Sequence, residues 1–197
     1  MIKCLIGNGG HAREVMSQMG LTLTRFVDDE FWKEGDDKLL PLSKFDSSKY
    51  IVMIAVGSSK DRYNICKKLP KETQYFTYIH PTALILDHNI EIGDGSFIGA
   101  YSVLTTNIKI GKHSLLNRGN HIGHDCDIGD FFSAMPGSIV SGNVKLGERV
   151  YIGTNSSIKE KINITNDVTI GLNSGVVSDI NMSGVYGGIP CKKIKTV

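Results

Sequence analysis

The stretch NRGNHIGHDCDIGD, residues 117–130, places two histidines among glycines and carboxylates. Asp125 directly follows His124. A carboxylate beside an imidazole is typical of a general base, because it orients the ring and favours proton uptake near neutral pH. His121 lies three residues before His124, where a second metal ligand could stand. The residues therefore leave three interpretations open: a catalytic base with its carboxylate, a metal site, or polar filling of a repeated structure.

A metal site lacks the ligands that it needs. His88 lies two repeats of 18 residues before His124, but the chain places no third histidine that would complete a three-histidine zinc site with this pair. The cysteines are far apart and show no paired metal spacing; they are Cys4, Cys66, Cys126 and Cys191. We therefore predict no metal cofactor, and reduced thiols in a cytoplasmic protein.

The second half of the chain repeats every six residues. From Ile92 to Val176, each sixth residue is aliphatic, with no insertion that breaks the register. Glycine often follows the aliphatic residue, and serine or valine favours the fifth place of the hexad. This period fits neither a helix nor an amphipathic strand. It fits a short strand followed by a corner, three of which close a triangular coil of 18 residues. A plain β-sandwich is the alternative architecture.

The physical roles within the hexad follow from this geometry. We expect the aliphatic residue to point into a prism, and the glycine after it to allow the tight turn at each corner. Stacked coils should lie about 4.8 Å apart, the ordinary spacing of strands. Neighbouring residues in a strand point to opposite faces, so Asp125 can reach His124 only if the chain turns there, and we expect Gly123 to provide that corner.

The first 79 residues show a different pattern. Buried strands are predicted at 2–6, 24–29, 50–57 and 74–79, with helices at 13–19 and 60–69. This alternation of strand and helix indicates a parallel sheet. We therefore predict an α/β Rossmann-like domain over residues 1–79, followed by an all-β parallel β-helix domain over residues 80–197.

A glycine loop, GNGGHA at residues 7–12, separates the first strand from the first helix. Asp28 follows Gly7 by 21 residues, the spacing at which a carboxylate can meet a ribose hydroxyl. A dinucleotide domain needs two such halves, and this segment supplies one. The loop therefore favours a mononucleotide, bound by backbone amides at the helix N-terminus, over NAD. A loop that serves only as a tight turn is the alternative.

Composition excludes several classes of partner. The chain has 197 residues, and 22 basic against 20 acidic residues give a net charge of +2. We therefore expect neither nucleic acid nor membrane as a partner. The longest apolar run that we identify, residues 51–56, is far shorter than the roughly 20 residues of a membrane span.

Taken in order, the motifs GNGGH, FVDD, IAVG, HP, the hexads, HDCDIGD and GGIPCKKI resemble one family over nearly the whole chain. It is the bacterial nucleotide-sugar N-acetyltransferase family, which acetylates a 4-amino sugar, together with relatives that O-acetylate sialic acid. The resemblance implies a left-handed β-helix, a homotrimer with clefts between subunits, and acetyl-CoA as the co-substrate. It also implies that His124 is the general base and that Asp125 raises its basicity.

The resemblance also assigns binding residues. Those expected to hold the nucleotide-sugar substrate are Gly9, Gly10, His11, Asp28, Asp29 and Gly57. Those expected to contact acetyl-CoA are Ser133, Gly142, Thr154, Leu172, Ile189, Pro190 and Lys192. Ser133 departs from the family, whose well-studied members carry a histidine there; a hydroxyl can donate a hydrogen bond but cannot share a positive charge.

The chain is thus predicted to acetylate the amino group of a nucleotide-linked amino-deoxysugar, for surface polysaccharide or glycan synthesis. O-acetylation of sialic acid or a related sugar is the alternative enzyme function. A catalytically inert binding or scaffold subunit is the alternative from another class, and the intact His124–Asp125 pair argues against it.

Overall fold

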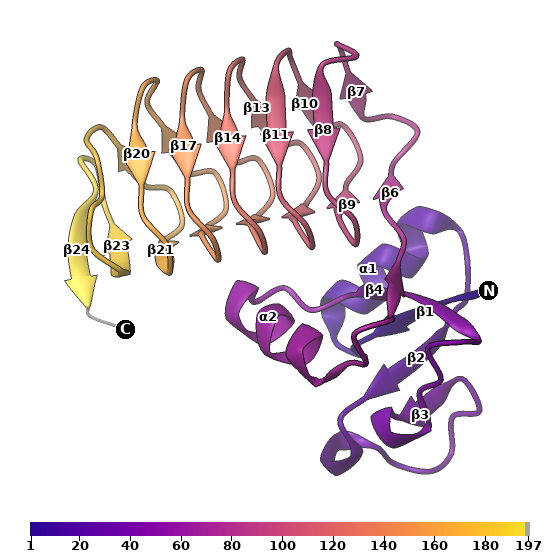
Figure 1. The fold of residues 1–197 in the computed structure, drawn as a ribbon. Helices are drawn as coiled ribbons and strands as arrows, with labels where there is room; N and C mark the ends of the chain where they lie inside the picture. The colour runs from indigo at the N-terminus through magenta and orange to yellow at the C-terminus, as the bar shows by residue number, and fades with distance from the viewer. Residues whose placement is uncertain (196–197) are drawn as a thin grey trace.

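The N-terminal part of the chain forms a five-stranded parallel sheet, in a computed structural model that describes residues 1–195 (Figure 1). Its strands, in the order β3-β2-β1-β4-β5, are β1 (Ile2–Ile6), β2 (Thr24–Val27), β3 (Leu39–Pro41), β4 (Tyr50–Ile54) and β5 (Gln74–Tyr75). Two α-helices, α1 (Gly10–Met19) and α2 (Ser59–Lys68), and two 3-10 turns, Asp29–Phe31 and Leu42–Lys44, join them.

This sheet buries apolar side chains on both faces. Leu5 and Met53 pack with Val15 of α1, whereas Phe26 and Val52 belong to a second cluster on the other face. The predicted helices are present, and β3 is an addition. The strand predicted at 74–79 divides in two, because only its first part, β5, joins this sheet, whereas Tyr78 and Ile79 pair with Phe97 and Ile98 of the domain predicted over residues 80–197. A parallel sheet with only two α-helices does not by itself confirm the Rossmann-like description, which stays a prediction.

The rest of the chain winds into a three-sided prism of stacked coils (Figure 1). Its strands are β6 (Tyr78–Ile79), β7 (Leu84–Ile85), β8 (Ile90–Ile92), β9 (Phe97–Ile98), β10 (Val103–Leu104), β11 (Ile108–Ile110), β12 (Leu115–Leu116), β13 (His121–Ile122), β14 (Asp127–Ile128), β15 (Ser133–Ala134), β16 (Ile139–Val140), β17 (Lys145–Leu146), β18 (Tyr151–Ile152), β19 (Ser157–Ile158), β20 (Asn163–Ile164), β21 (Val168–Ile170), β22 (Gly175–Val176), β23 (Gly184–Gly187) and β24 (Lys192–Lys195). All pair in parallel except β23 with β24.

The three faces of the prism are separate sheets. The covered face, against which the N-terminal unit packs, runs β24-β23-β21-β18-β15-β12-β9-β6. The second face runs β22-β19-β16-β13-β10-β7, and the third runs β20-β17-β14-β11-β8. We call the edge between the covered and second faces the α1 edge, because α1 contacts it at Ala100 and Arg118. The edge between the second and third faces is the His124 edge.

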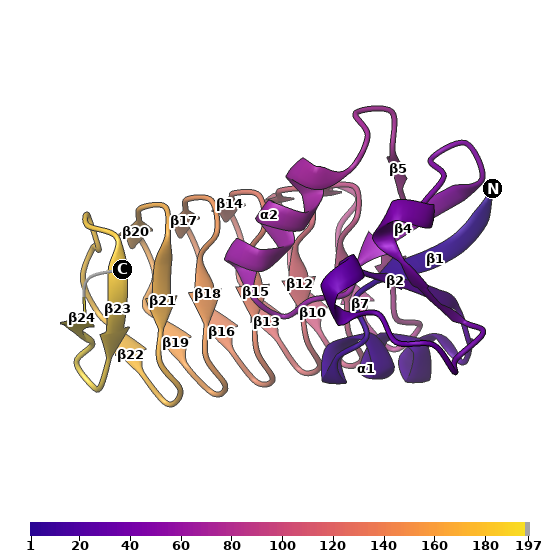
Figure 2. The same cartoon turned by 90° about the horizontal axis from the view of Figure 1, so that it is seen from below.

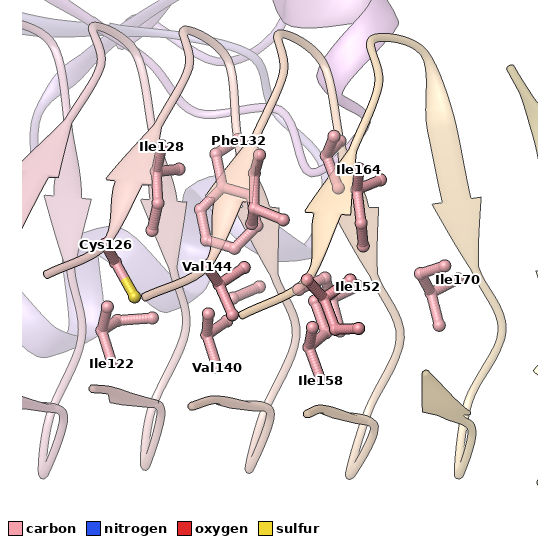
Figure 3. Close-up of a cluster of buried hydrophobic side chains, with 14 of the residues drawn as sticks. Ile122, Cys126, Ile128, Phe132, Val140, Val144, Ile152, Ile158, Ile164 and Ile170 are labelled. Atoms are coloured by element: carbon pink, nitrogen blue, oxygen red, sulfur yellow. The ribbon is translucent and has the colours of Figure 1, made fainter. Parts of the chain in front are cut away.

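The predicted hexad core is confirmed. Leu104, Leu116, Val140 and Ile152 are completely buried. Figure 3 shows part of this core, in which Val140 and Ile152 point into the prism together with Ile128 and Ile164. The serines of the fifth place are buried too, and their hydroxyls donate to backbone carbonyls; Ser138, for example, donates to the carbonyl of Gly153 at 3.0 Å. Each buried hydroxyl therefore has a partner and costs little to bury.

The predicted role of the hexad glycines was wrong. The chain turns at a left-handed residue two places after the glycine position, at every sixth residue from Gly95 to Asn173. Gly123 itself does not have positive φ. It is required because a Cβ there would lie 2.7 Å from the backbone nitrogen of Gly142 in the next coil. The hexad glycine thus permits close stacking of coils, and the left-handed residue makes the corner.

Arg62 of α2 joins the N-terminal unit to the prism. Its guanidinium is buried and meets no carboxylate among residues 1–195. It donates instead to five backbone carbonyls, those of His113, Phe131 and Phe132 in the prism and of Val56 and Gly57 in its own unit. Burial lowers the pKa of Arg62 to about 9. Figure 2 shows α2 lying across the covered face.

No helix within residues 1–195 combines the length and the apolar content that crossing a membrane requires.

The Arg62 contact predicts a large effect on stability. Arg62→Ala leaves carbonyls buried without donors, and we expect it to lower the free energy of unfolding by about 3–5 kcal/mol. Lys60→Ala, an exposed change on the same helix, should stay within about 0.5 kcal/mol. Urea unfolding measures both. A loss below about 1 kcal/mol in Arg62→Ala would show that apolar packing alone holds the two parts together.

Candidate active site

His124 and Asp125 form a hydrogen-bonded pair on the His124 edge. Nδ1 of His124 lies 2.7 Å from Oδ2 of Asp125, and about half of each side chain is exposed. Because a carboxylate can only accept, Nδ1 carries the proton and Nε2 is left as an acceptor. Hydrogen bonds from Asn107 and from His124 hold the pKa of Asp125 below its usual value. The pair is therefore an ionised carboxylate with a ring that can take a proton.

The left-handed turn explains how two consecutive side chains meet. Asp125 has φ of +58°, so its side chain folds back towards His124 instead of pointing to the opposite face. The expected contact between the two residues is confirmed, but the corner lies at Asp125 and not at Gly123. The backbone of Asp125 is also tied to the coil before it, because its N–H donates to the carbonyl of Thr106 at 3.1 Å.

Gly142 lies one coil beyond His124, directly against the imidazole. A Cβ at this position would lie 2.5 Å from Nε2 of His124. Because glycine has no side chain, the Nε2 side of the imidazole can pack directly against the buried backbone of Gly142. Within residues 1–195, the N–H of Gly142 donates to no backbone carbonyl. A carbonyl oxygen bound next to His124 could accept from this N–H, as in an oxyanion site.

A pocket of about 630 Å³ opens at the glycine loop of the N-terminal unit. Its volume falls within the range of small-molecule sites. It brings together Gly9 and Asp28 of the predicted substrate residues, with Phe31 of the first 3-10 turn and Asn64 of α2. Lys68 closes one side, because its Nζ donates to both oxygens of Asp28 at 3.0 and 2.9 Å.

Gly10 and His11 line a neighbouring pocket, between α1 and the α1 edge. The ring of His11 packs edge-to-face on Phe97, and its Nδ1 has no hydrogen-bond partner within residues 1–195; a carboxylate oxygen of Glu14 lies 3.7 Å from it. Burial, and then the charge of Arg62, lower the pKa of His11 to about 4. His11 is therefore a neutral ring at neutral pH.

Three predicted binding residues, Asp29, Gly57 and Ser133, form hydrogen bonds within the chain. Asp29 accepts a hydrogen bond from the backbone N–H of Ser43 at 3.0 Å and does not line the glycine-loop pocket. Ser133 is completely buried; its hydroxyl donates to the carbonyl of Gly57 at 2.9 Å and contacts the hydroxyl of Ser59. The Ser133 hydroxyl thus holds the N-terminus of α2 against the prism.

The remaining residues expected to contact acetyl-CoA are exposed. Thr154 and Leu172 stand one coil apart on the α1 edge, where the N–H of Asn173 donates to the carbonyl of Thr154. Ile189, Pro190 and Lys192 lie at the end of the prism, in and beside the β23–β24 hairpin. Ile189 is 78% exposed.

The predicted catalytic and binding residues do not converge within one chain. The N-terminal unit packs on the covered face, and the His124 edge is the edge opposite to that face (Figure 1). Thr154 and Leu172 lie on the α1 edge, with the second face between them and His124. The predicted catalytic residues and the predicted acetyl-CoA contacts Thr154 and Leu172 thus lie on two different edges of the prism.

Two residues that matter here carried little signal in the sequence. Asn107 donates from Nδ2 to Oδ1 of Asp125 at 2.6 Å, and only its position 18 residues earlier could have indicated this contact. Arg62 resembles any other charged residue of a surface helix. Within residues 1–195, no three side chains of His, Cys, Asp or Glu gather in a way that could hold a metal ion.

Comparison with solved structures supports the fold. No family model and no curated protein matches the chain. A mutant of perosamine N-acetyltransferase from Caulobacter crescentus, in complex with CoA and GDP-perosamine, matches 98% of this chain and 97% of its own, at 23% identity and a TM-score of 0.87. WeeI from Acinetobacter baumannii matches 98% and 100%, at 27% identity and a TM-score of 0.86. The acetyltransferase domain of PglB from Neisseria gonorrhoeae, in complex with acetyl coenzyme A, matches 98% of both chains, at 23% identity and a TM-score of 0.66.

The chain shares the fold of the nucleotide-sugar N-acetyltransferases. This agrees with the resemblance stated from the motifs. A hexapeptide transferase family protein from Anaplasma phagocytophilum matches only 61% of the chain, at 19% identity and a TM-score of 0.52. The prism thus fits the left-handed β-helix of hexapeptide transferases, and the longer matches extend over the N-terminal unit as well.

Proposed function

We propose that this protein transfers an acetyl group from acetyl-CoA to the amino group of a nucleotide-linked amino-deoxysugar in the cytoplasm. The observation that carries the proposal is the exposed His124–Asp125 pair, with Nε2 of His124 beside the side-chain-free Gly142. The solved structures of the same fold add support, because one of them is a perosamine N-acetyltransferase bound to CoA and GDP-perosamine.

The chemistry assigns a separate task to each group. Nε2 of His124 takes a proton from the sugar amine as the nitrogen attacks the thioester carbonyl. A C–N bond forms and the C–S bond breaks, and His124 returns the proton to the departing thiolate. The N–H of Gly142 stabilises negative charge on the carbonyl oxygen. Asp125 stays ionised and balances the charge that the imidazole gains.

The fold also supports assembly into a homotrimer with shared sites. The second face separates the His124 edge from the α1 edge and exposes apolar side chains, with Leu84 53% and Ile139 45% exposed. If this face packs between subunits, the His124 edge of one chain meets the α1 edge and the glycine-loop pocket of the next. Each site then takes its base from one subunit and its nucleotide pocket from another.

Asp28 lines the glycine-loop pocket and Asp29 does not, so the two carboxylates should differ in their effect on nucleotide binding. Asp28→Ala removes a pocket carboxylate, and we expect it to weaken binding of a nucleoside diphosphate by about 1–3 kcal/mol. Asp29→Ala is the matched control and should change binding much less, because its carboxylate accepts from Ser43 outside the pocket. Calorimetry with UDP and GDP measures both, and acetyl-CoA affinity should stay constant. Equal losses in the two variants would argue against this pocket as the nucleotide site.

The role of the base is tested by turnover. His124→Ala should lower kcat by about 10²–10⁴-fold, while both substrates still bind. His121→Ala is the control, because His121 lies on the second face and, within residues 1–195, its side chain makes no hydrogen bond to Asp125 or Gly142. Near-normal turnover of the His124→Ala enzyme would rule out this mechanism.

The group that accepts the acetyl is identified by testing which sugars the protein acetylates. Assays with nucleotide-linked amino sugars and with free sialic acid separate N-acetylation from O-acetylation. Activity on the sugar acid without nucleotide dependence would favour the alternative enzyme function.

A further inference from the structure

The contact between His124 and Asp125 lies in solvent. The two side chains are 56% and 45% exposed, and an exposed ion pair or hydrogen bond of this kind contributes little to holding a geometry. A carboxylate free to rotate would exchange His124 for water much of the time. A base that must keep one ring orientation therefore needs a further group that fixes the carboxylate.

Asn107 provides that group. It stands one coil before Asp125 on the same edge, and its Nδ2 donates to Oδ1 of Asp125 at 2.6 Å. The other oxygen, Oδ2, faces Nδ1 of His124 at 2.7 Å. Each carboxylate oxygen is thus engaged by a different partner, and rotation of the carboxylate would break both contacts together.

The backbone holds Asn107 and Asp125 in matching positions. Both residues have a left-handed backbone conformation, with φ of +50° and +58°, and they occupy the same corner position in successive coils. The side chains of two such residues leave the edge in the same direction, about one strand spacing apart, or about 4.8 Å. That separation suits an amide donating to a carboxylate.

A simpler explanation is that asparagine tolerates left-handed backbone better than most residues. Asn143, Asn155 and Asn173 occupy the same corner place, and this preference accounts for them. Within residues 1–195, Asn107 is the one corner asparagine whose side chain donates to a carboxylate of the next coil. Backbone preference therefore explains why asparagine fits at 107, and not why it faces Asp125.

We propose that Asn107 is a positioning residue for acetyl transfer, which holds Asp125 so that His124 keeps its proton on Nδ1 and presents Nε2 to the substrate. This inference rests on the proposed function of His124. The other charged residues along this edge stand two coils or more away from His124: Asp87 and His88 on one side, and Lys159, Glu160, Lys161 and Asp179 on the other. Two coils are about 10 Å, beyond direct contact.

The experiment compares Asn107→Gly with Asn143→Gly. Both changes keep left-handed backbone accessible and remove an exposed corner amide, so their effects on the melting temperature should match. Asn107→Gly alone should lower kcat/KM by about 10- to 100-fold, the range found when a metal-binding histidine loses the partner that orients it. The Kd of acetyl-CoA should not change in either variant.

A second measurement does not depend on turnover. Long-range ¹H–¹⁵N NMR spectra report which ring nitrogen of His124 carries the proton. We expect the Nδ1–H form to dominate in the wild type and in Asn143→Gly, and to lose population in Asn107→Gly. Asn107→Asp keeps the side-chain shape but sets a second carboxylate against Asp125, and should cause the same loss.

Two results would overturn the proposal. One is a wild-type tautomer population in Asn107→Gly; the other is an equal loss of kcat/KM in the two glycine variants. A wrong assignment of His124 as the base gives another result, because His124→Ala would then keep its turnover. In that case the tautomer measurement would still report whether Asn107 orients Asp125 and His124.

Discussion

A left-handed residue at every sixth position is the constraint on which this structure depends. It turns the chain at each corner of the prism, and it lets coils stack with aliphatic side chains inside. The same turn brings Asp125 back to His124, two neighbours that an extended strand would separate. The contact between His124 and Asp125 therefore follows from the geometry of the repeat, in which the left-handed residue after the histidine folds its side chain back towards the ring.

The second constraint is where the N-terminal unit sits. Arg62 and the Ser59–Ser133 contact fix α2 on the covered face, so the glycine-loop pocket and the His124 edge of one chain lie on opposite sides of the prism. A buried guanidinium with only carbonyl partners tolerates little movement, because each lost contact leaves an unpaired polar group. The proposed sharing of sites between subunits follows from this rigidity rather than from a flexible hinge between the two units.

Much of the fold could be predicted from the sequence, because the hexads report one dominant effect, burial of an aliphatic residue inside a coil. The role of the glycines could not be predicted. Glycine is favoured both where two backbones approach closely and where the backbone has positive φ, and the sequence alone does not distinguish the two. Strand β3 was missed because its three residues are too short to show a pattern. His124 was predicted from a resemblance, whereas Asn107 and Arg62 act through contacts that only three-dimensional stacking creates.

Subunit complementation tests the central claim most directly. His124→Ala is combined by co-expression with Gly9→Glu, which has open space for the side chain and places a negative charge where phosphate should bind. If equal amounts of the two variants assemble at random, half of the chains carry an intact base and half carry an intact pocket. An intact base then lies next to an intact pocket at one quarter of the interfaces. We therefore predict about a quarter of wild-type activity from two inactive parents. Hybrids no more active than either parent would contradict a site shared between chains.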